Sequence, residues 1–405
     1  MASSHHSLQF PLFTALLALL GTRLVVTYDT SILKSTFAAA PATCLTSIFS
    51  FGDSLADTGN LLHYLGDDAG PFAHLPYGET YFHNATGRFS DGRLIIDFIA
   101  QSLGLPLVPP YLAGTNAQDF RYGANFAVAG ATALDNDFFR AKGLNVTWSE
   151  YSLVVQFNWF KQLLPSLCST DSDCKGIISN SLFLVGEIGW NDHGYSFNEG
   201  RTADEIRTFI PNIIEVISSV IDDLIKLGAK TLVVPGIFPS GCVPVYLTWM
   251  QSEIVEDYDP DTGCIKWVNE FSAYHNQLLQ NELDRIRRLH PHVTIIYADY
   301  YEALMSVFRS PEKFGFKKAP LDACCGGGGP YNVNFSLPCG GPMATVCKDP
   351  SKFVFWDDAH PTEAATEIVA RGLLEGPYAY PPILQACSKV ESDASQLQPL
   401  FHPTK

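Results

Sequence analysis

Residues Ser47–Asn60 read SIFSFGDSLADTGN, an apolar run that breaks abruptly at Gly52, Asp53 and Ser54. Such a run, bounded by a turn, predicts a buried β-strand that ends at Gly52. The polar residues after it can simply form a turn and cap a helix, because Asp and Ser side chains accept hydrogen bonds from free backbone N–H groups. Alternatively, Ser54 is a nucleophile at the end of the strand, which requires a base, an orienting acid and oxyanion donors from elsewhere in the chain.

The composition indicates one large folded domain. The chain has 405 residues, of which 46% are hydrophobic and 17% charged, a balance typical of a protein with a substantial core. No Ser/Gly-rich or charged linker divides the sequence, so we expect a single domain over residues 44–390 and a C-terminal tail at 391–405. The formal net charge of −16 disfavours nucleic acid and anionic membrane surfaces as partners, and it leaves the oligomeric state open.

The N-terminal segment has the pattern of a signal peptide. Phe10–Gly21 reads FPLFTALLALLG, an apolar run too short to span a bilayer comfortably. We expect residues 1–27 to be removed, with the small residues of Ala38–Ala42 as an alternative cleavage point. A membrane anchor is the competing interpretation. No later segment is apolar enough to span, so we expect a secreted protein without stable membrane insertion.

Cysteine usage agrees with an oxidising compartment. Disulfides are favoured over metal binding because the sequence has no Cys-x-x-Cys pair, no His-Glu-x-x-His and no finger-like Cys/His spacing. Cys168 and Cys174 enclose a polar loop and are the expected local pair, and CCGGGGP at Cys324–Pro330 is interpreted as a disulfide-tied surface loop. The ten cysteines that would remain after cleavage are Cys44, Cys168, Cys174, Cys242, Cys264, Cys324, Cys325, Cys339, Cys347 and Cys387. Sequons that predict N-glycosylation stand at Asn84, Asn145 and Asn334.

Apolar strands alternate with helical stretches along the chain, which predicts an α/β fold with a parallel sheet covered on both faces. Helices are expected within Gly92–Gly104, within Ala203–Gly228 and over Trp267–Leu289; Pro211 either kinks the second or marks its true start, and Gly228 caps its end. The expected strands are Ser47–Phe51, Asn125–Val128, Leu182–Val185, Thr231–Val234, Val293–Tyr297 and Phe353–Trp356.

Chemically useful side chains follow four of these strands. In open α/β sheets ligands bind outside the carboxyl ends of the strands, so these residues are expected at one edge. They are Ser54 after the first strand, Gly130 after the second, Asn191 and Asp192 after the third, and Asp357 and His360 after the last.

This set contains the parts of a serine hydrolase. A neutral His360 can take the proton of Ser54, while Asp357, three residues before His360, orients the ring and stabilises the imidazolium. The backbone N–H groups of Ser54 and Gly130 and the side-chain amide of Asn191 can then hold the oxyanion. Taken singly, each residue also fits a structural role, such as a tight turn, an Asx turn or a helix cap. Their shared position after predicted strands favours the catalytic interpretation.

Five blocks of the sequence resemble, in order, those of the plant GDSL esterase/lipase family within the SGNH hydrolases. The resemblance covers about Cys44 to Cys387 and implies a flavodoxin-like three-layer α/β/α fold. It also implies that Ser54, Gly130, Asn191 and His360 have the four family roles, with Asp357 as the third triad member. The blocks are FGDSLADTGN (Phe51–Asn60), GRFSDGR (Gly87–Arg93), YGANFAVAGAT (Tyr122–Thr132), LFLVGEIGWND (Leu182–Asp192) and FWDDAHPTEAA (Phe355–Ala365).

Two residues depart from the expected pattern. Trp190 stands where small residues are frequent in relatives and is a candidate to narrow the substrate pocket. Asp358 stands beside Asp357 as a second possible carboxylate, although the spacing to His360 favours Asp357.

We therefore predict a secreted serine carboxylester hydrolase, apoplastic or vacuolar, that acts on a small-molecule acyl ester through an acyl-enzyme without a metal or an organic cofactor. An acyltransferase with the same triad and an alcohol acceptor is the first alternative. A catalytically silent glycoprotein that binds a small molecule or a cell-wall polymer is the second. The sequence identifies neither the acyl group nor the alcohol of the substrate.

Overall fold

The computed structural model describes residues 45–145 and 150–386, and every structural statement below refers to these residues. The predicted signal peptide at 1–27, Cys44, Cys387 and the tail at 391–405 lie outside the described residues.

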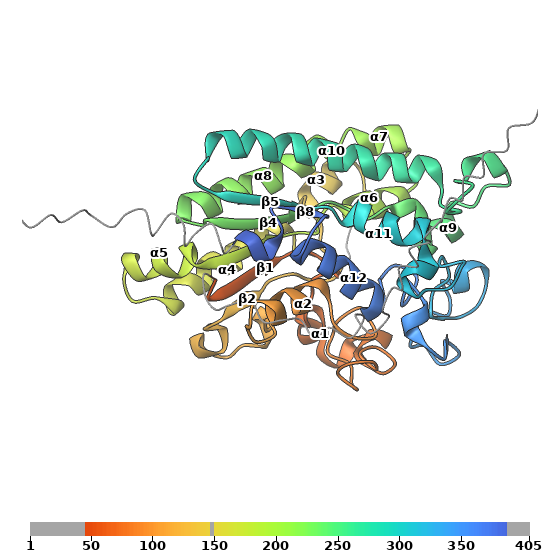
Figure 1. Ribbon diagram of the computed structural model, residues 1–405, viewed down its shortest axis with the longest axis horizontal. Coiled ribbons are helices and arrows are strands. Elements are labelled where there is room, and N and C mark those ends of the chain that lie inside the picture. The colour runs from red at the N-terminus through yellow and green to blue at the C-terminus, as the bar shows by residue number, and fades with distance from the viewer. Residues whose placement is uncertain (1–44, 146–149, 387–405) are drawn as a thin grey trace, which may run out of the picture. The chain divides into compact units, whose positions relative to one another are not determined.

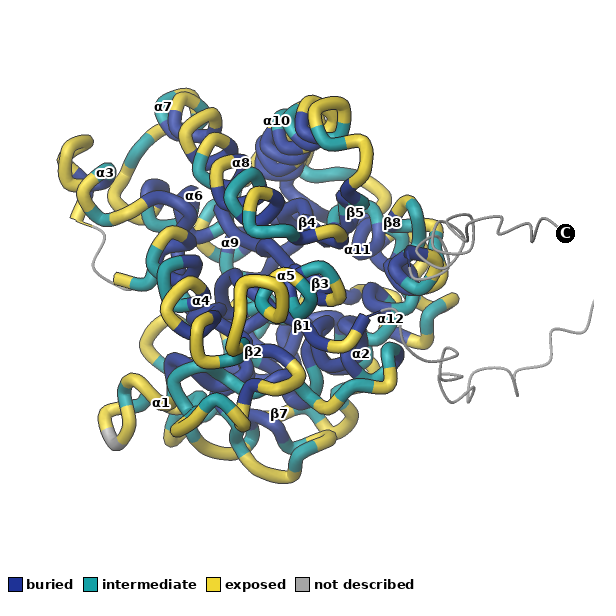
Figure 2. Tube along the Cα trace, turned by 90° about the vertical axis from the view of Figure 1, so that its left-hand side faces the viewer, coloured by how far each residue is buried: buried dark blue, intermediate teal, exposed yellow. Residues whose placement is uncertain are grey.

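A six-stranded sheet forms the centre of the fold (Figures 1 and 2). Five strands run parallel, and the short edge strand β8 (Ala379–Tyr380) is antiparallel to β5. Strands β1, β3 and β4 are buried along their whole length, as expected for strands covered on both faces. The remaining strands, in spatial order, are β2 (Gly123–Asn125), β1 (Ser47–Phe51), β3 (Ser181–Val185), β4 (Thr231–Pro235) and β5 (Thr294–Ala298).

Helices lie on both sides of this sheet, which makes the fold the predicted α/β sandwich (Figure 2). One side carries α4 (Leu153–Leu167) and α8 (Ile210–Leu227), which pack on each other, and α10 (Lys266–Leu289) packs on α8. The other side carries α2 (Ile95–Ser102) and α12 (Glu363–Leu374), which also pack on each other. The other helices of four or more residues in α conformation are α1 (Asn60–Leu65), α3 (Asn136–Ala141), α5 (Asp171–Ser179), α6 (Trp190–Asn198), α7 (Ala203–Arg207), α9 (Pro244–Trp249) and α11 (Tyr300–Arg309).

The helix predictions are confirmed with small shifts of their ends. The stretch Ala203–Gly228 contains two helices, α7 and α8, and Pro211 stands in the first turn of α8, where its missing N–H has no helical partner to lose. Gly228 ends α8 with φ of 115°, in the left-handed region where glycine carries no steric penalty.

Four of the six predicted strands are confirmed, one is shifted and one is wrong. Strand β2 ends at Asn125, although Phe126 and Val128 still donate backbone hydrogen bonds to the β1 segment, at 2.7 and 3.2 Å. The segment Phe353–Trp356 is not a strand of the sheet. Its backbone carbonyls accept instead from the CCGGGGP loop, with Cys324 N donating to Phe355 O and Cys325 N to Trp356 O. The prediction was wrong because a short apolar run indicates that a segment is buried but does not indicate which segment its backbone hydrogen-bonds to.

Four disulfides link the described cysteines, none of which is free. The predicted pair Cys168–Cys174 is confirmed. The expected tie of the CCGGGGP loop is also confirmed. Cys324 and Cys347, which flank the small β6–β7 hairpin (Cys325–Gly326 and Thr345–Val346), form one bridge, and Cys325 of β6 bonds to Cys339 in the segment between the two strands. The fourth bridge joins Cys242 to Cys264.

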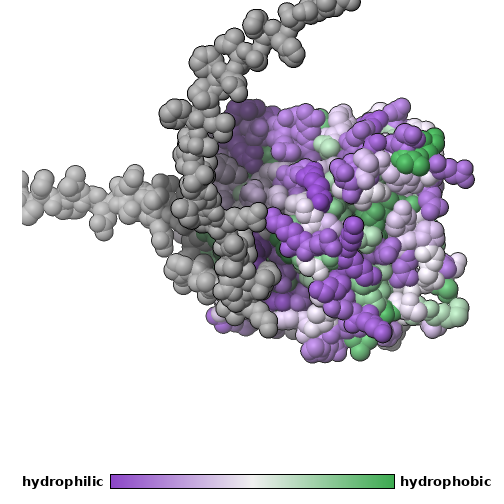
Figure 3. All heavy atoms as spheres, turned by 45° about the vertical axis from the view of Figure 1, so that its right-hand side comes forward, coloured by the Kyte–Doolittle hydropathy of each residue, from purple (hydrophilic) through white to green (hydrophobic). Residues whose placement is uncertain are grey.

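The surface outside the grey atoms in Figure 3 is mostly hydrophilic, with hydrophobic side chains scattered over it. Two of the three sequon asparagines, Asn84 and Asn145, are exposed, whereas Asn334 is partly buried and its Oδ1 accepts from Ser336 N at 3.0 Å. Within the described ranges, no helix combines the length and the apolar character that a membrane span requires.

Candidate active site

Ser54 lies on a tight turn directly after β1. Gly52 ends the strand with φ of 149°, and a Cβ there would stand 2.9 Å from the backbone oxygen of Glu187, so only glycine fits. Gln156 from α4 holds the Gly52 peptide from both sides, because its amide accepts from Gly52 N at 2.9 Å and donates to Gly52 O at 2.8 Å. Asp53 closes the turn by accepting from Leu55 N at 3.0 Å. The strand end therefore presents Ser54 in a fixed position at the carboxyl edge of the sheet.

His360 links Ser54 to Asp357. His360 Nε2 lies 2.8 Å from Ser54 Oγ, and His360 Nδ1 lies 2.8 and 2.9 Å from the two carboxylate oxygens of Asp357. Asp357 also accepts from the backbone N–H groups of Ala359 at 3.0 Å and of His360 at 2.8 Å. The structure thus brings the three predicted residues together in the order serine, imidazole and carboxylate, a geometry that suits transfer of the serine proton to the ring.

The charges around His360 favour its protonated form. Burial lowers the pKa of His360, but the facing Asp357 carboxylate, with smaller contributions from Asp358 and Asp53, raises this pKa above its ordinary value. Burial raises the pKa of Asp357, while the charge of His360 and the hydrogen bonds from it hold that pKa below its ordinary value. The pair is therefore arranged to stabilise an imidazolium.

We expect the rate of ester hydrolysis to rise with pH through one ionisation above the ordinary histidine pKa of about 6.5. A general base must be neutral, and Asp357 raises the pKa of His360, so activity is low below this pKa and increases as the pH rises through it. The buried His193 and His275 have pKa values lowered by burial and stay neutral across this range. The measurement is kcat/KM between pH 5 and 9, and a flat profile would contradict the assignment of His360 as base.

The two backbone N–H groups expected to bind an oxyanion have no protein partner among the described residues. In the part of the chain that the structure describes, neither Ser54 N nor Gly130 N donates to a protein acceptor. The amide of Asn191 is engaged: its Nδ2 donates to Asp53 Oδ2 at 2.9 Å and to Ala131 O at 3.0 Å. The two backbone groups therefore keep an unused donor, which is what an oxyanion hole requires, whereas the Asn191 amide already has two acceptors.

Buried carboxylates hold the loop that carries Gly130. Asp57 Oδ2 accepts from Ala129 N at 2.9 Å. Asp192 accepts from Ala133 N at 2.8 Å and from Leu134 N at 3.0 Å. The loop is therefore fixed on both sides of Gly130. Asp57 was not predicted as part of the site. Its position three residues after Ser54, followed by small residues, was the feature of the sequence that could have indicated it.

Tyr77 is a further neighbour of the site that the sequence analysis missed. It is 5% exposed, and its hydroxyl donates to Asp357 Oδ2 at 2.8 Å. Tyr77 belongs to a buried cluster with Trp356 and the disulfide cysteines Cys324, Cys325 and Cys339. The disulfide-tied loop therefore packs against the residues that carry and orient Asp357. No local pattern could reveal this contact, because 280 residues separate Tyr77 from Asp357 in the chain.

Replacing Tyr77 by phenylalanine is expected to lower kcat by roughly 10- to 100-fold, because a hydrogen bond to a charged group contributes about 1.5–3 kcal/mol. KM should change little, since Tyr77 does not touch Ser54. The matched control is Tyr81→Phe: Tyr81 lies on the same segment, and its hydroxyl accepts from Gln101 at 3.0 Å. Steady-state kinetics and the melting temperature of both variants test this. Equal kcat values for the two variants would show that Tyr77 only packs.

Trp190 and Asp358, the two departures from the expected pattern, both lie near α9. Trp190 begins α6 and is partly buried; its indole N–H donates to Ser240 Oγ at 3.0 Å, and its ring packs edge-on against Tyr246. The backbone oxygen of Asp358 accepts from Val245 N at 2.8 Å. Burial raises the pKa of the Asp358 carboxyl to about 6, and the charge of Asp357 adds to this. His360 Nδ1 contacts Asp357 rather than Asp358, as the spacing predicts.

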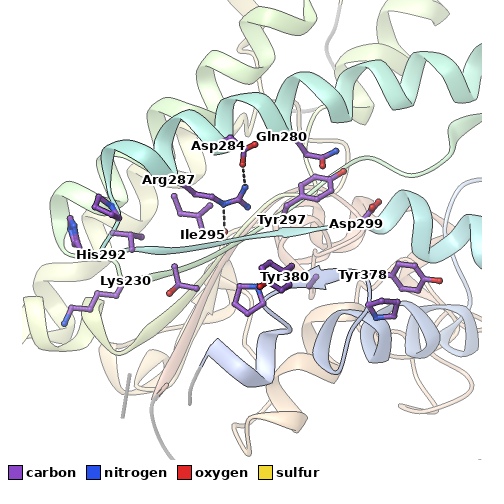
Figure 4. A pocket seen from close by; sticks show the side chains of 16 residues that line it. Lys230, Gln280, Asp284, Arg287, His292, Ile295, Tyr297, Asp299, Tyr378 and Tyr380 are labelled. Atoms are coloured by element: carbon purple, nitrogen blue, oxygen red, sulfur yellow. Dashed lines mark hydrogen bonds and ion pairs between the residues drawn. The ribbon is translucent and has the colours of Figure 1, made fainter. Parts of the chain in front are cut away.

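A large cavity of about 1170 Å³ lies elsewhere, along the outer edge of β5 (Figure 4). Its lining combines basic and acidic side chains, and Arg287 there donates to Ile295 O at 2.9 Å and to Asp284 at 2.7 Å. None of the residues at the carboxyl ends of β1 and β3 lines it, so the cavity is separate from Ser54 and His360. Across residues 45–145 and 150–386, no group of three or more His, Cys, Asp or Glu side chains could hold a metal ion.

Known proteins resemble this chain over most of its length. Residues 48–373 match the family described as GDSL-like lipase/acylhydrolase. A GDSL esterase/lipase of Arabidopsis thaliana is 52% identical over 351 residues, which cover 86% of this chain and 90% of that protein. A second one from the same plant is 54% identical over 84% of this chain and 86% of its own length. A sinapine esterase of Brassica napus is 50% identical over 86% of this chain and 91% of its own length.

Proposed function

Because the chain belongs to the GDSL-like lipase/acylhydrolase family and is a carboxylic ester hydrolase, we propose that it cleaves acyl esters of small plant metabolites or lipids through an acyl-enzyme on Ser54. The observation that carries this proposal is the position of His360, whose two ring nitrogens lie 2.8 Å from Ser54 Oγ and 2.8 Å from Asp357 Oδ1. This arrangement supports a serine nucleophile with a histidine base and an orienting carboxylate.

In the first half-reaction, Ser54 Oγ attacks the ester carbonyl carbon while its proton moves to His360 Nε2. The carbonyl oxygen becomes an oxyanion that binds the N–H groups of Ser54 and Gly130. It also competes with Ala131 O for one hydrogen of the Asn191 amide, while Asp53 keeps the other. When the tetrahedral intermediate collapses, the C–O bond to the alcohol breaks, and the alcohol leaves with the proton from His360.

In the second half-reaction, water attacks the acyl group, again with His360 as base, and releases the acid and free Ser54. An alcohol in place of water would give a new ester instead. No residue assigned here requires a metal or an organic cofactor.

We also propose that the protein is secreted, to the apoplast or the vacuole. Four disulfides among the described cysteines and two exposed sequon asparagines, Asn84 and Asn145, support passage through an oxidising compartment.

The test is to incubate the purified protein with a chromogenic short-chain ester and with a panel of plant acyl esters, and to identify the products by mass spectrometry. Sinapine belongs in the panel because one relative is a sinapine esterase. Graded amounts of candidate alcohols are added in parallel. Free acid as the main product would support hydrolysis, whereas new ester at modest alcohol concentration, with hydrolysis restored by Trp190→Gly, would indicate a transferase. Absence of any turnover would count against the proposal.

A further inference from the structure

Glu187 is a buried acid for which the proposed reaction has no use. It follows β3 at the carboxyl edge of the sheet and is 1% exposed. Among the described residues, neither of its carboxyl oxygens has a partner at hydrogen-bond distance and angle, and the backbone N–H of Trp190 is the one donor near enough to favour its ionised form. Within the described ranges it also forms no ion pair with Lys, Arg or His. An ionised carboxylate that lacks a cation and a full set of donors is very costly in the protein interior, so Glu187 requires a different explanation.

The carboxyl group of Asp53 supplies the missing partner. The turn that carries Asp53 packs directly on Glu187, since a Cβ at Gly52 would stand 2.9 Å from Glu187 O, and the interaction of the two carboxyls raises the pKa of Glu187 and lowers that of Asp53. Asp53 is also 1% exposed, and its two oxygens already accept from Leu55 N at 3.0 Å and from Asn191 Nδ2 at 2.9 Å. Two carboxylates in contact in the interior cannot both ionise, so the pair holds one proton.

The proton belongs on Glu187 rather than on Asp53. Asp53 accepts from two donors at 3.0 and 2.9 Å, whereas only the backbone N–H of Trp190 favours the ionised form of Glu187, whose oxygens have no described partner at hydrogen-bond distance and angle. Burial raises the pKa of both groups, but that of Asp53 reaches only about 6, whereas that of Glu187 is raised much further by burial and by the charge of Asp53. Asp192 and the hydroxyls of Tyr246 and Tyr300 also lie near Glu187, and none of these carries a positive charge.

We propose that Glu187 is a positioning residue that stays protonated and donates its hydrogen bond to Asp53, which keeps Asp53 an acceptor that orients the Asn191 amide. This inference rests on the proposed esterase reaction, because it assigns Asn191 to the oxyanion. Glu187 therefore acts through two other residues and does not touch the substrate. Its neutral form also keeps a negative charge away from the place where the oxyanion develops.

Two neutral substitutions of Glu187, both similar to it in volume, distinguish the effect of its hydrogen bond to Asp53 from the effect of its packing. Glu187→Gln keeps a donor for Asp53, whereas Glu187→Met fills the space without one. We expect Glu187→Gln to retain most of kcat, and Glu187→Met to lose roughly 10- to 100-fold in kcat with little change in KM. The melting temperature and circular dichroism show whether both variants fold.

Two further readouts do not depend on how well the Met variant folds. Infrared spectra at neutral pH should show a protonated carboxylic acid band in the wild type that weakens in Glu187→Gln. The wild-type kcat should fall at alkaline pH as the shared proton leaves, and this fall should be absent in Glu187→Gln, which has no proton to lose.

The outcomes are distinct from those that test the esterase itself. A wild type without ester hydrolysis would refute the proposed function, while the infrared band would still report whether Glu187 is protonated. An unchanged band in Glu187→Gln, or equal kcat values for folded Gln and Met variants, would overturn the role of Glu187. A folded Glu187→Gln variant without activity would also overturn it, because an ionised Glu187 would then be required.

Discussion

Replacing Ser54 by alanine is expected to lower the turnover of a chromogenic ester on the order of 10³-fold or more, as removal of the nucleophile does in other serine hydrolases. The reason is that no neighbouring group can replace Oγ: His360 Nε2, 2.8 Å away, is positioned to accept a proton and not to attack the ester. The residual rate would come from binding and the oxyanion donors alone. KM should stay within a fewfold of the wild-type value, because the methyl group of alanine leaves the pocket intact.

The control is Ser47→Ala at the opposite end of β1. Ser47 is buried and shares a 2.6 Å hydrogen bond with Ser181, so its loss tests the strand without touching the site. A serine-directed organophosphate should add once to the wild type, at Ser54, and should not add to Ser54→Ala. Modification at another serine, or hydrolysis that survives in folded Ser54→Ala, would refute the assignment of the nucleophile.

The positions of the candidate site residues were predictable because parallel strands place their carboxyl ends at one edge. Ser54 and Asn191 come after β1 and β3, which are neighbours in the sheet, and a run of buried apolar residues marks each of these strands. Asp357 and His360 also lie beside Ser54, although the strand predicted before them is absent. The segment before them is held by backbone hydrogen bonds from Cys324 and Cys325 rather than by a neighbouring strand of the sheet.

The contacts that support these residues were not predictable in the same way. Tyr77 reaches Asp357 across 280 residues of chain, and only the folded CCGGGGP loop and its two disulfides bring the surrounding cluster together. Glu187 did carry a sequence signal: an acid that stands between Gly186 and Ile188, just after a buried strand, has little access to water. What the sequence could not show was its partner, because Asp53 and Glu187 are far apart in the chain and meet only where β1 and β3 pair.

The buried acids around Ser54 point to an electrostatic division of tasks. Asp357 faces His360 and is placed to stabilise a positive charge on the ring. Asp57 and Asp192 accept hydrogen bonds from backbone N–H groups and fix the loop on either side of Gly130. Asp53 connects the turn of Ser54 to the amide of Asn191. Several negative charges near a developing oxyanion would oppose the reaction, so each must be neutralised by hydrogen bonds or by a proton.

Replacing Asn191 by alanine is expected to lower kcat by about 10²- to 10³-fold, equivalent to roughly 2.7–4 kcal/mol of transition-state stabilisation. The amide is the one oxyanion donor that a substitution can remove, because the other two candidates are backbone N–H groups. Its loss also leaves Asp53 Oδ2 and Ala131 O without a donor, so some thermal stability should be lost as well. Kinetics must therefore be measured well below the melting temperature, with active enzyme counted by organophosphate titration.

A second substitution distinguishes a donor to the oxyanion from a residue that only holds the turn. Asn191→Asp preserves the shape of the side chain but adds a negative charge beside the position of the oxyanion. If the site stabilises negative charge, Asn191→Asp must be at least as slow as Asn191→Ala, since a like charge opposes the transition state more than an absent donor does. If Asn191 is only a turn residue, folded Asn191→Ala should keep the wild-type rate per active site, and the oxyanion would then rest on Ser54 and Gly130 alone.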